Sequence, residues 1–171
     1  MSRGVELMLI YHPAADANHC CYRLVNILRS IDGDDLSMSM LRLLDFYYLY
    51  PHLLKKINPL PRPINRRSSY IMKLADPFEI TTSPQLLFHE LSLIQDSAVR
   101  SLAEKGLIQV NSDDVRLIIE NVPVELISYC EADEFSRSDA FDIVTNYVSK
   151  SVLNGKNGLK ARSGLMEYRY D

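Results

Sequence analysis

The segment from Ser37 to Leu54 constrains the fold most, because a helix of this composition has almost no polar face. Apolar side chains occur on all sides of the predicted helix, at Met40, Leu41, Leu43, Leu44, Phe46, Tyr47, Leu49 and Leu53. Such a helix is either buried on several sides or packed against a partner. Ser37 or Ser39 is expected to cap the helix, and Pro51 is expected to break or kink it near Tyr50.

An amphipathic helix is predicted before this segment, from Asp16 to about Ile31. Its apolar side chains recur at steps of three and four residues, at Cys20 or Cys21, Leu24, Ile27, Leu28 and Ile31. Asp16 is expected to cap this helix, and Gly33 is expected to end it in a turn. The shorter apolar run over residues 6–11 fits either a strand or a helix.

No acidic residue lies between Asp45 and Asp76, and the cations of this stretch are Lys55, Lys56, Arg62, Arg66, Arg67 and Lys73. Prolines at alternate positions, Pro59, Pro61 and Pro63, favour an extended, polyproline-like path without a core signal. The basic segment is predicted to lie along an acidic protein surface or along phosphate groups. The alternative is a solvated connector of positive composition. It lacks the interleaved aromatic residues that base stacking would need, since Tyr70 stands alone after the run.

A long helical pattern begins at Ser83 and Pro84, the residue types expected at a helix start. One face stays apolar through Leu87, Leu91, Ile94, Ala98 and Leu102. The pattern fits one helix as far as Lys105, or a helix-turn-helix pair with a turn near residues 95–97. Gly106 ends the pattern in either case.

Beyond Gly106 the hydrophobic period changes. The β-favouring runs 107–110 and 115–119 flank residues 111–114, which have the composition of a turn, and together they predict a hairpin. Further helices are predicted after Pro123 and from about residue 138 to 152. The tail from Asn154 is predicted to be loosely ordered.

These elements predict a mainly α-helical fold with a small β-hairpin, arranged as a winged-helix-like core with additional N- and C-terminal helices. One domain is expected over residues 1–171. Its expected parts are an N-terminal helical part (1–57), a basic proline-rich linker (58–75), a winged-helix-like part (76–130), a C-terminal helix (131–153) and a tail (154–171).

A winged helix that reads DNA places the helix before the hairpin in the major groove. That helix would here present Gln95, Arg100, Ser101 and Lys105, while Asp96 and Glu104 would repel phosphate. A module that docks onto other proteins is therefore favoured, and a DNA-binding transcriptional regulator is the alternative. The net charge of −3 also argues against a protein that coats nucleic acid through its overall field.

No pattern of a P-loop, a nucleophile elbow or a zinc-binding histidine pair occurs in the sequence. His12, His19, Cys20 and Cys21 lie close together without the spacing of zinc ligands. We therefore expect no catalysis, no metal, no cofactor and no small-molecule substrate. The odd cysteine count and the lack of a secretory or membrane-spanning pattern predict a cytoplasmic protein.

Tyrosines gather in the apolar segment at Tyr47, Tyr48 and Tyr50. Packing in the core is the simpler role for these side chains. The functional alternative is that one of them faces outward as an anchor for a partner, because tyrosine is enriched at protein interfaces.

Four stretches follow one another in an order that resembles a known family. They are residues 41–51, the proline-rich stretch 62–67, residues 83–88 and residues 102–108. This order is similar to that of the small middle component of ABC-three-component systems, a group that includes the accessory subunit of Lamassu-type antiphage defence. The resemblance implies an adaptor between an SMC-like ATPase and an effector, commonly a nuclease. It transfers no catalytic residue, and it leaves contact with DNA inside the complex open.

Overall fold

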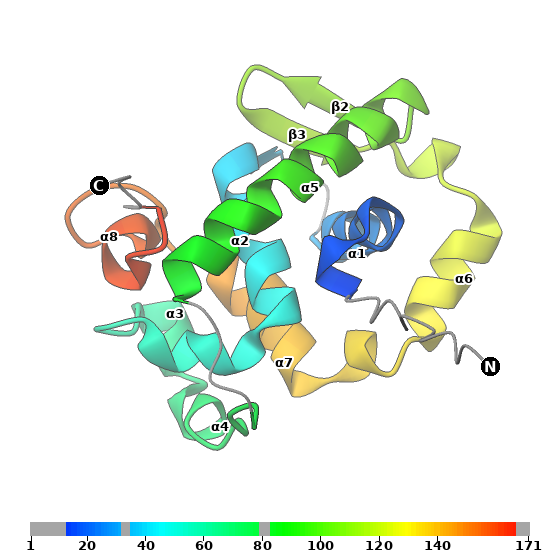
Figure 1. Cartoon of the computed structure of the whole chain (residues 1–171). Helices are drawn as coiled ribbons and strands as arrows, with labels where there is room; N and C mark the ends of the chain where they lie inside the picture. The colour runs from blue at the N-terminus through cyan, green and yellow to red at the C-terminus, as the bar shows by residue number, and fades with distance from the viewer. Residues whose placement is uncertain (1–12, 32–34, 79–82, 167–171) are drawn as a thin grey trace, which may run out of the picture.

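The computed structural model describes residues 13–31, 35–78 and 83–166, so the predictions for residues 6–11, His12 and Gly33 lie outside the described residues. Over these ranges the fold is mainly helical with a small antiparallel sheet (Figure 1). The α-helices are α1 (Ala17–Ser30), α2 (Met38–Leu49), α3 (Arg62–Asn65), α4 (Ser68–Ile71), α5 (Pro84–Glu104), α6 (Val124–Ala132), α7 (Asp139–Asp142) and α8 (Leu159–Ser163). The strands are β1 (Leu36–Ser37), β2 (Ile108–Asn111) and β3 (Asp114–Leu117). Shorter helical turns are η1 (Pro13–Ala15), η2 (Pro51–Lys56), η3 (Ile119–Asn121) and η4 (Phe135–Arg137), and η5 (Ile143–Val148) is π-helical.

Helices α1 and α2 begin where the sequence predicts. Asp16 caps α1 by accepting a hydrogen bond from the backbone amide two residues on (2.9 Å). Ser37 caps α2 by accepting one from the amide three residues on (3.2 Å). Helix α2 ends at Leu49, with Tyr50 as its C-cap immediately before Pro51, because proline lacks the amide hydrogen that would continue the helix.

The core forms around α2, which packs against α1, α5 and η5. The apolar character of α2 on all sides follows from this position, and the prediction that this helix is buried on several sides is confirmed. Leu43, Leu44 and Phe46 of α2 are fully buried, as are Leu24 and Ile27 of α1. Burying an aliphatic or aromatic side chain of this size stabilises a fold by about 1.5–3 kcal/mol.

Helix α5 is one continuous helix, and the alternative with a turn near residues 95–97 is wrong. Ser83 caps it and Pro84 is its first residue, as predicted. The chain leaves α5 through Gly106, whose φ of 69° lies in the left-handed region that favours glycine. Leu107 then donates a backbone hydrogen bond to the carbonyl of Leu102 (2.9 Å), which closes the helix end.

The predicted hairpin forms from β2 and β3, with Ile108 opposite Leu117 and Asn111 opposite Asp114. Strand β1 pairs with the other edge of β3, which gives the antiparallel order β1-β3-β2. Strand β1 was not predicted, because two residues directly before a helix carry no alternating pattern. A mainly helical fold with a small antiparallel sheet is confirmed, and the winged-helix assignment stays a prediction.

The prediction of an extended linker over residues 58–75 is wrong, because this segment folds into α3 and α4. Pro61 and Pro63 occupy the N-cap and the second position of α3, where a missing amide hydrogen costs no helical hydrogen bond. Ile64 and Ile71 are fully buried and belong to the core. These isoleucines favour burial, but the prolines around them favour an extended path, and the prediction followed the prolines.

The C-terminal part is helical over α7 and η5, in agreement with the predicted helix. The described part of the tail is better ordered than predicted, since Leu159 of α8 and Leu165 are buried in the core. Helix α8 lies beside α3 at the left of Figure 1, where Asn58 N donates to the carbonyl of Arg162 (3.2 Å). Among the described residues, no helix is long and apolar enough to cross a membrane.

Candidate functional site

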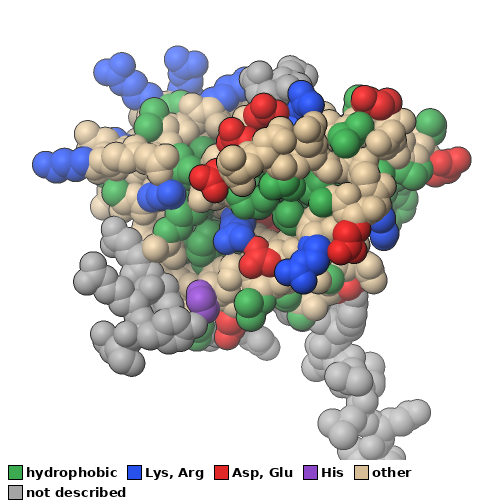
Figure 2. All heavy atoms as spheres, turned by 90° about the horizontal axis from the view of Figure 1, so that it is seen from above, with side chains coloured by type: hydrophobic (Ala, Val, Ile, Leu, Met, Phe, Trp, Pro, Cys, Tyr) green, Lys and Arg blue, Asp and Glu red, His purple; other side chains and the backbone are tan. Residues whose placement is uncertain are grey.

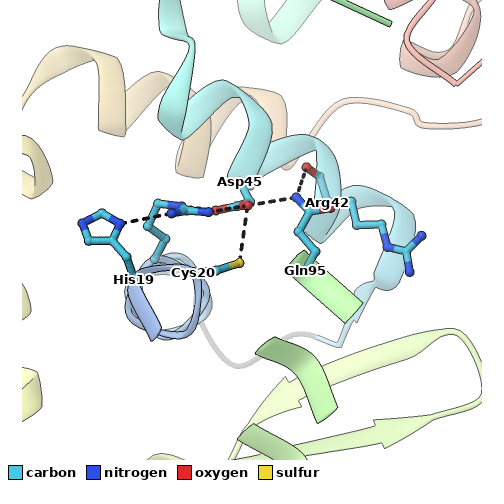
Figure 3. Close-up of polar contacts among 6 residues, drawn as sticks. His19, Cys20, Arg42, Asp45 and Gln95 are labelled. Carbon is cyan, nitrogen blue, oxygen red and sulfur yellow. Dashed lines mark hydrogen bonds and ion pairs between the residues drawn. The ribbon is translucent and has the colours of Figure 1, made fainter. Parts of the chain in front are cut away.

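A central polar cluster lies at the point where α1, α2 and α5 meet (Figure 3). We define it as Arg23, Asp45 and Gln95. Arg23 binds Asp45 through two hydrogen bonds, Nε to Oδ1 (2.6 Å) and one terminal nitrogen to Oδ2 (3.1 Å). Gln95 Nε2 donates to the same Oδ2 (2.9 Å) and to the carbonyl of Arg42 (3.2 Å). The side chains of Arg23 and Asp45 are 0% exposed, so the cluster fastens three helices from within the core.

The electrostatics of the cluster follow from its burial. Burial acts to lower the pKa of Arg23, but hydrogen bonding and attraction to Asp45 outweigh it and leave this pKa raised. Burial, together with the negative charge of Asp45, raises the pKa of the neighbouring Cys20 thiol. The thiol therefore stays protonated and donates to Asp45 (3.8 Å) rather than acting as a nucleophile.

Within the described ranges, some cations of the predicted basic segment form ion pairs and others do not. Lys55 Nζ donates to Asp76 (2.7 Å) and to the carbonyl of Leu74 (2.8 Å). Arg67 pairs with Asp139 (2.5 Å) and lies 4.0 Å from a carboxylate oxygen of Asp142. These two cations hold neighbouring segments together, so their charges are already matched within the chain.

Arg62 and Arg66 instead face a groove between α3 and the C-terminal segment. A hollow of about 540 Å³ is lined by both arginines and by Lys150. A second hollow of about 320 Å³ continues from it, shares Arg62 and Lys150, and reaches Arg162. We call this feature the basic groove and define it by Arg62, Arg66, Lys150 and Arg162. Figure 2 shows Lys and Arg side chains projecting at the left edge, the side of the molecule that carries α3 and α8 in Figure 1.

The remaining predicted cations do not line the groove. Lys56 and Lys73 are exposed, and neither borders the two hollows. Two of the four residues that define the groove, Lys150 and Arg162, were not predicted, because they are distant in sequence from the basic segment. Only the packing of α8 and η5 beside α3 brings them to it.

The predicted tyrosine anchors lie mostly inside the fold. Tyr47 is 1% exposed, and burial raises its pKa. Tyr48 is buried with its ring centroid 4.4 Å from that of Phe135, and Tyr50 is half-buried against Phe46. Tyr47 and Tyr48 therefore pack in the core. The prediction that either of them faces outward as an anchor for a partner is wrong.

A surface that the sequence reasoning did not assign lies on α6 and the turns around it. Residues 117–136 contain no lysine or arginine, and their carboxylates are Glu120, Glu125, Glu131, Asp133 and Glu134. Ile119, Val124 and Tyr129 are exposed on the same segment, Tyr129 by 67%. We call this the α6 surface. The run of acids was readable in the sequence, but the exposure of its apolar residues was not.

A small hollow of about 370 Å³ opens between α1 and α6, lined by Tyr22, Tyr129 and Asp133 among others. Tyr22 donates its hydroxyl hydrogen to Asp133 (2.5 Å), and its ring meets Tyr129 edge-on at 5.5 Å. His19, at the rim, lies 3.1 Å from a terminal nitrogen of Arg23, so this surface is connected to the central polar cluster. Burial and the charge of Arg23 lower the pKa of His19.

Only some of the side chains predicted to read DNA are exposed. Gln95 is buried in the central polar cluster, whereas Arg100 and Lys105 are exposed. Asp96 and Glu104 are exposed on the same helix, so α5 does not present a positive face. Within the described ranges, no group of three or more His, Cys, Asp or Glu side chains is placed to hold a metal ion.

Comparison with known proteins gives one match. The sequence model described as ABC-three component (ABC-3C) system Middle Component 5 matches residues 9–171. No curated protein and no solved structure matches the chain. The match covers nearly the whole chain, including the C-terminal part that forms one wall of the basic groove. The chain therefore belongs to the family of ABC-three-component system middle component 5, and membership of a three-component system implies partner subunits.

Proposed function

We propose that this protein is a non-catalytic adaptor in a cytoplasmic defence complex of the Lamassu type. It holds an SMC-like ATPase and an effector, commonly a nuclease, in one assembly. The family supplies the middle position in a three-component system. The adaptor role and the identity of the two partners are our proposal.

The observation that carries the proposal is a pair of surfaces with opposite charge on opposite sides of one core. The basic groove lies on the side of α3 and α8, and the α6 surface lies at the other side of Figure 1. Each combines charge with apolar area, since Val152 is 73% exposed beside the groove and Val124 is 74% exposed on α6. Interfaces combine such apolar contacts with a polar rim. A subunit that bridges two different partners needs two separate surfaces of this kind.

Co-expression of the three components, with an affinity tag on this chain, tests the proposal. The wild-type chain is expected to retain both partner subunits. Arg62→Glu combined with Arg66→Glu is expected to release one partner while the other stays bound. Lys73→Glu combined with Lys156→Glu is the matched control, because it makes the same change in net charge at exposed lysines outside the groove.

Two results would contradict the proposal. A wild-type chain that purifies alone from cells expressing both partners is not an adaptor. Turnover of a substrate by the isolated chain, lost on substitution of a surface residue, would show that the chain is catalytic.

A further inference from the structure

We infer that the basic groove binds an acidic peptide segment of a partner subunit, with at least one apolar side chain between its carboxylates. The inference rests on the proposed adaptor function and names what one of its two surfaces recognises. It goes beyond the earlier prediction for the basic segment, because half of the site comes from the C-terminal part of the chain.

The charges of the groove define the first property of its occupant. Arg62 and Arg66 are four residues apart, one turn of helix, and Lys150 lies across from them. Within the described residues, none of these three forms an ion pair with a carboxylate of the chain. Guanidinium groups bind carboxylates through paired hydrogen bonds, so the groove fits a ligand with several acidic groups.

One carboxylate, Asp142, also lines the groove. Its Oδ1 accepts a hydrogen bond from Asn146 Nδ2 (2.9 Å), and its Oδ2 lies 4.0 Å from Arg67. Asp142 offsets one of the three positive charges of Arg62, Arg66 and Lys150, so the first hollow keeps a net positive charge. At the other end, the buried Nε of Arg162 has no hydrogen-bond partner in the described part of the chain, and its Nη1 donates to the carbonyl of Pro59 (2.9 Å).

The apolar lining defines the second property and separates a peptide from a nucleic acid. Pro61, Pro63 and the exposed Val152 form part of the second hollow, directly beside Arg62 and Lys150. A phosphodiester backbone would leave this apolar area without a partner, whereas a peptide that alternates acidic and apolar side chains covers both. The net charge of −3 adds no long-range attraction for a polyanion such as DNA.

The walls of the groove are held in place without a ligand. Arg67 lies over the ring of Tyr147, 5.6 Å from its centroid, and its pairing with Asp139 ties the start of α4 to α7. At the other wall, a Cβ atom on Gly158 would come within 2.4 Å of the carbonyl of Asn154, so the chain makes its close turn only with glycine here. A preformed groove lowers the entropic cost of binding.

Photo-crosslinking in the assembled three-component complex tests the inference. The substitution Val152→benzoylphenylalanine places the photoreactive group in the groove, and Phe78→benzoylphenylalanine is the control at an exposed residue that lines neither hollow. The Val152 variant is expected to crosslink to one partner subunit. Mass spectrometry is expected to map the crosslink to a segment with several Asp or Glu residues flanking an apolar one.

A second pair of variants, carrying the same crosslinker, checks the charge requirement. Lys150→Glu is expected to lower the crosslink yield about tenfold or more, since it turns the attraction between this side chain and a carboxylate of the peptide into a repulsion. Lys156→Glu, which lies outside both hollows, is expected to leave the yield unchanged.

The outcomes separate the groove from the adaptor role. If the complex assembles but Val152→benzoylphenylalanine crosslinks to DNA, to a basic or neutral segment, or to nothing, the inference about the groove is wrong and the adaptor proposal stands. If no complex forms with the wild-type chain, the adaptor proposal itself fails. A crosslink that maps to a second copy of this chain would also show that the occupant is not a segment of a partner subunit.

Discussion

The central polar cluster and the basic groove use the same side chain, arginine, for opposite purposes. Arg23 is 0% exposed and bonded to Asp45, Gln95 bonds that same carboxylate, and the three residues join three helices. Arg62 at the start of the short helix α3 and Arg66 at its C-cap are exposed and form no ion pair within the described residues. The difference teaches that the position of a charge decides its use. A buried charge is matched inside the chain and specifies the fold, and an unmatched charge at a preformed groove is available to a partner.

Breaking the central polar cluster is expected to have the largest effect on stability. Asp45→Asn keeps the shape of the side chain but leaves the charge of Arg23 buried without its counterion, so the free energy of unfolding should fall by about 3–5 kcal/mol. Urea unfolding followed by circular dichroism measures this change. The control is the apolar replacement Arg23→Met with Asp45→Leu, which should cost less than the single change. A single change as mild as the double one would mean that the pair does not organise the three helices.

The next largest effect is expected at Ile64, which anchors the helix that carries the groove arginines. Ile64→Ala should lower the free energy of unfolding by about 2–5 kcal/mol, because the side chain is fully buried. The neighbouring exposed residue gives the control, since Asn65→Ala should change stability by no more than about 0.5 kcal/mol. Equal, small effects at both positions would indicate that residues 58–75 form the extended linker predicted from the prolines.

A smaller effect is expected from pH, through His19 at the edge of the central polar cluster. Burial, then Arg23, lowers the pKa of His19, while Asp16, Asp45 and Asp133 act in the opposite direction. At pH values below the ordinary histidine pKa of 6.5, the unfolded chain therefore binds more protons at His19 than the folded chain does. Stability should consequently fall as the pH is lowered from about 7 to 5.

His52, whose pKa is lowered mainly by burial, contributes in the same direction. Melting temperatures measured across this pH range should show a reduced slope for His19→Gln and for His52→Gln, and the smallest slope when both are changed. An unchanged slope in the double variant would exclude these histidines as its source.

The smallest effect on stability is expected at the groove cations. Arg62→Ala and Arg66→Ala should each change the free energy of unfolding by no more than about 0.5 kcal/mol, because these exposed side chains form no ion pair within the described residues. The same variants should weaken retention of a partner subunit in the co-purification described above. A loss of stability comparable to that of Ile64→Ala would show that these arginines serve the fold, and the contrast with Arg23 would disappear.

The sequence predicted those parts of the fold that depend on local chemistry. The caps at Asp16, Ser37 and Ser83, the exit at Gly106 and the hairpin all follow from residue types at fixed spacings, and the structure has each of them. The α3–α4 segment was not predictable in this way. Its helices are four residues long, and buried Ile64 and Ile71, rather than helix propensity, hold them in place.

The candidate site was predictable only in part, for the same reason. Arg62 and Arg66 stand out within a run of cations, but the sequence does not show that Lys55 and Arg67 are matched by Asp76 and Asp139. Lys150 reaches the groove through a contact between distant segments. Pairing across long sequence separations decides which charges stay available, and a single sequence does not record it.

The position of the groove between two distant segments has a consequence for how the subunit is made. One wall is synthesised early, around residue 62, and the other is complete only when Arg162 has been added and has bonded to Pro59. A chain lacking α8 therefore keeps the residues of the first hollow but loses Arg162, which lines the second. Recognition of a partner by the whole groove therefore depends on α8, whereas the α6 surface does not.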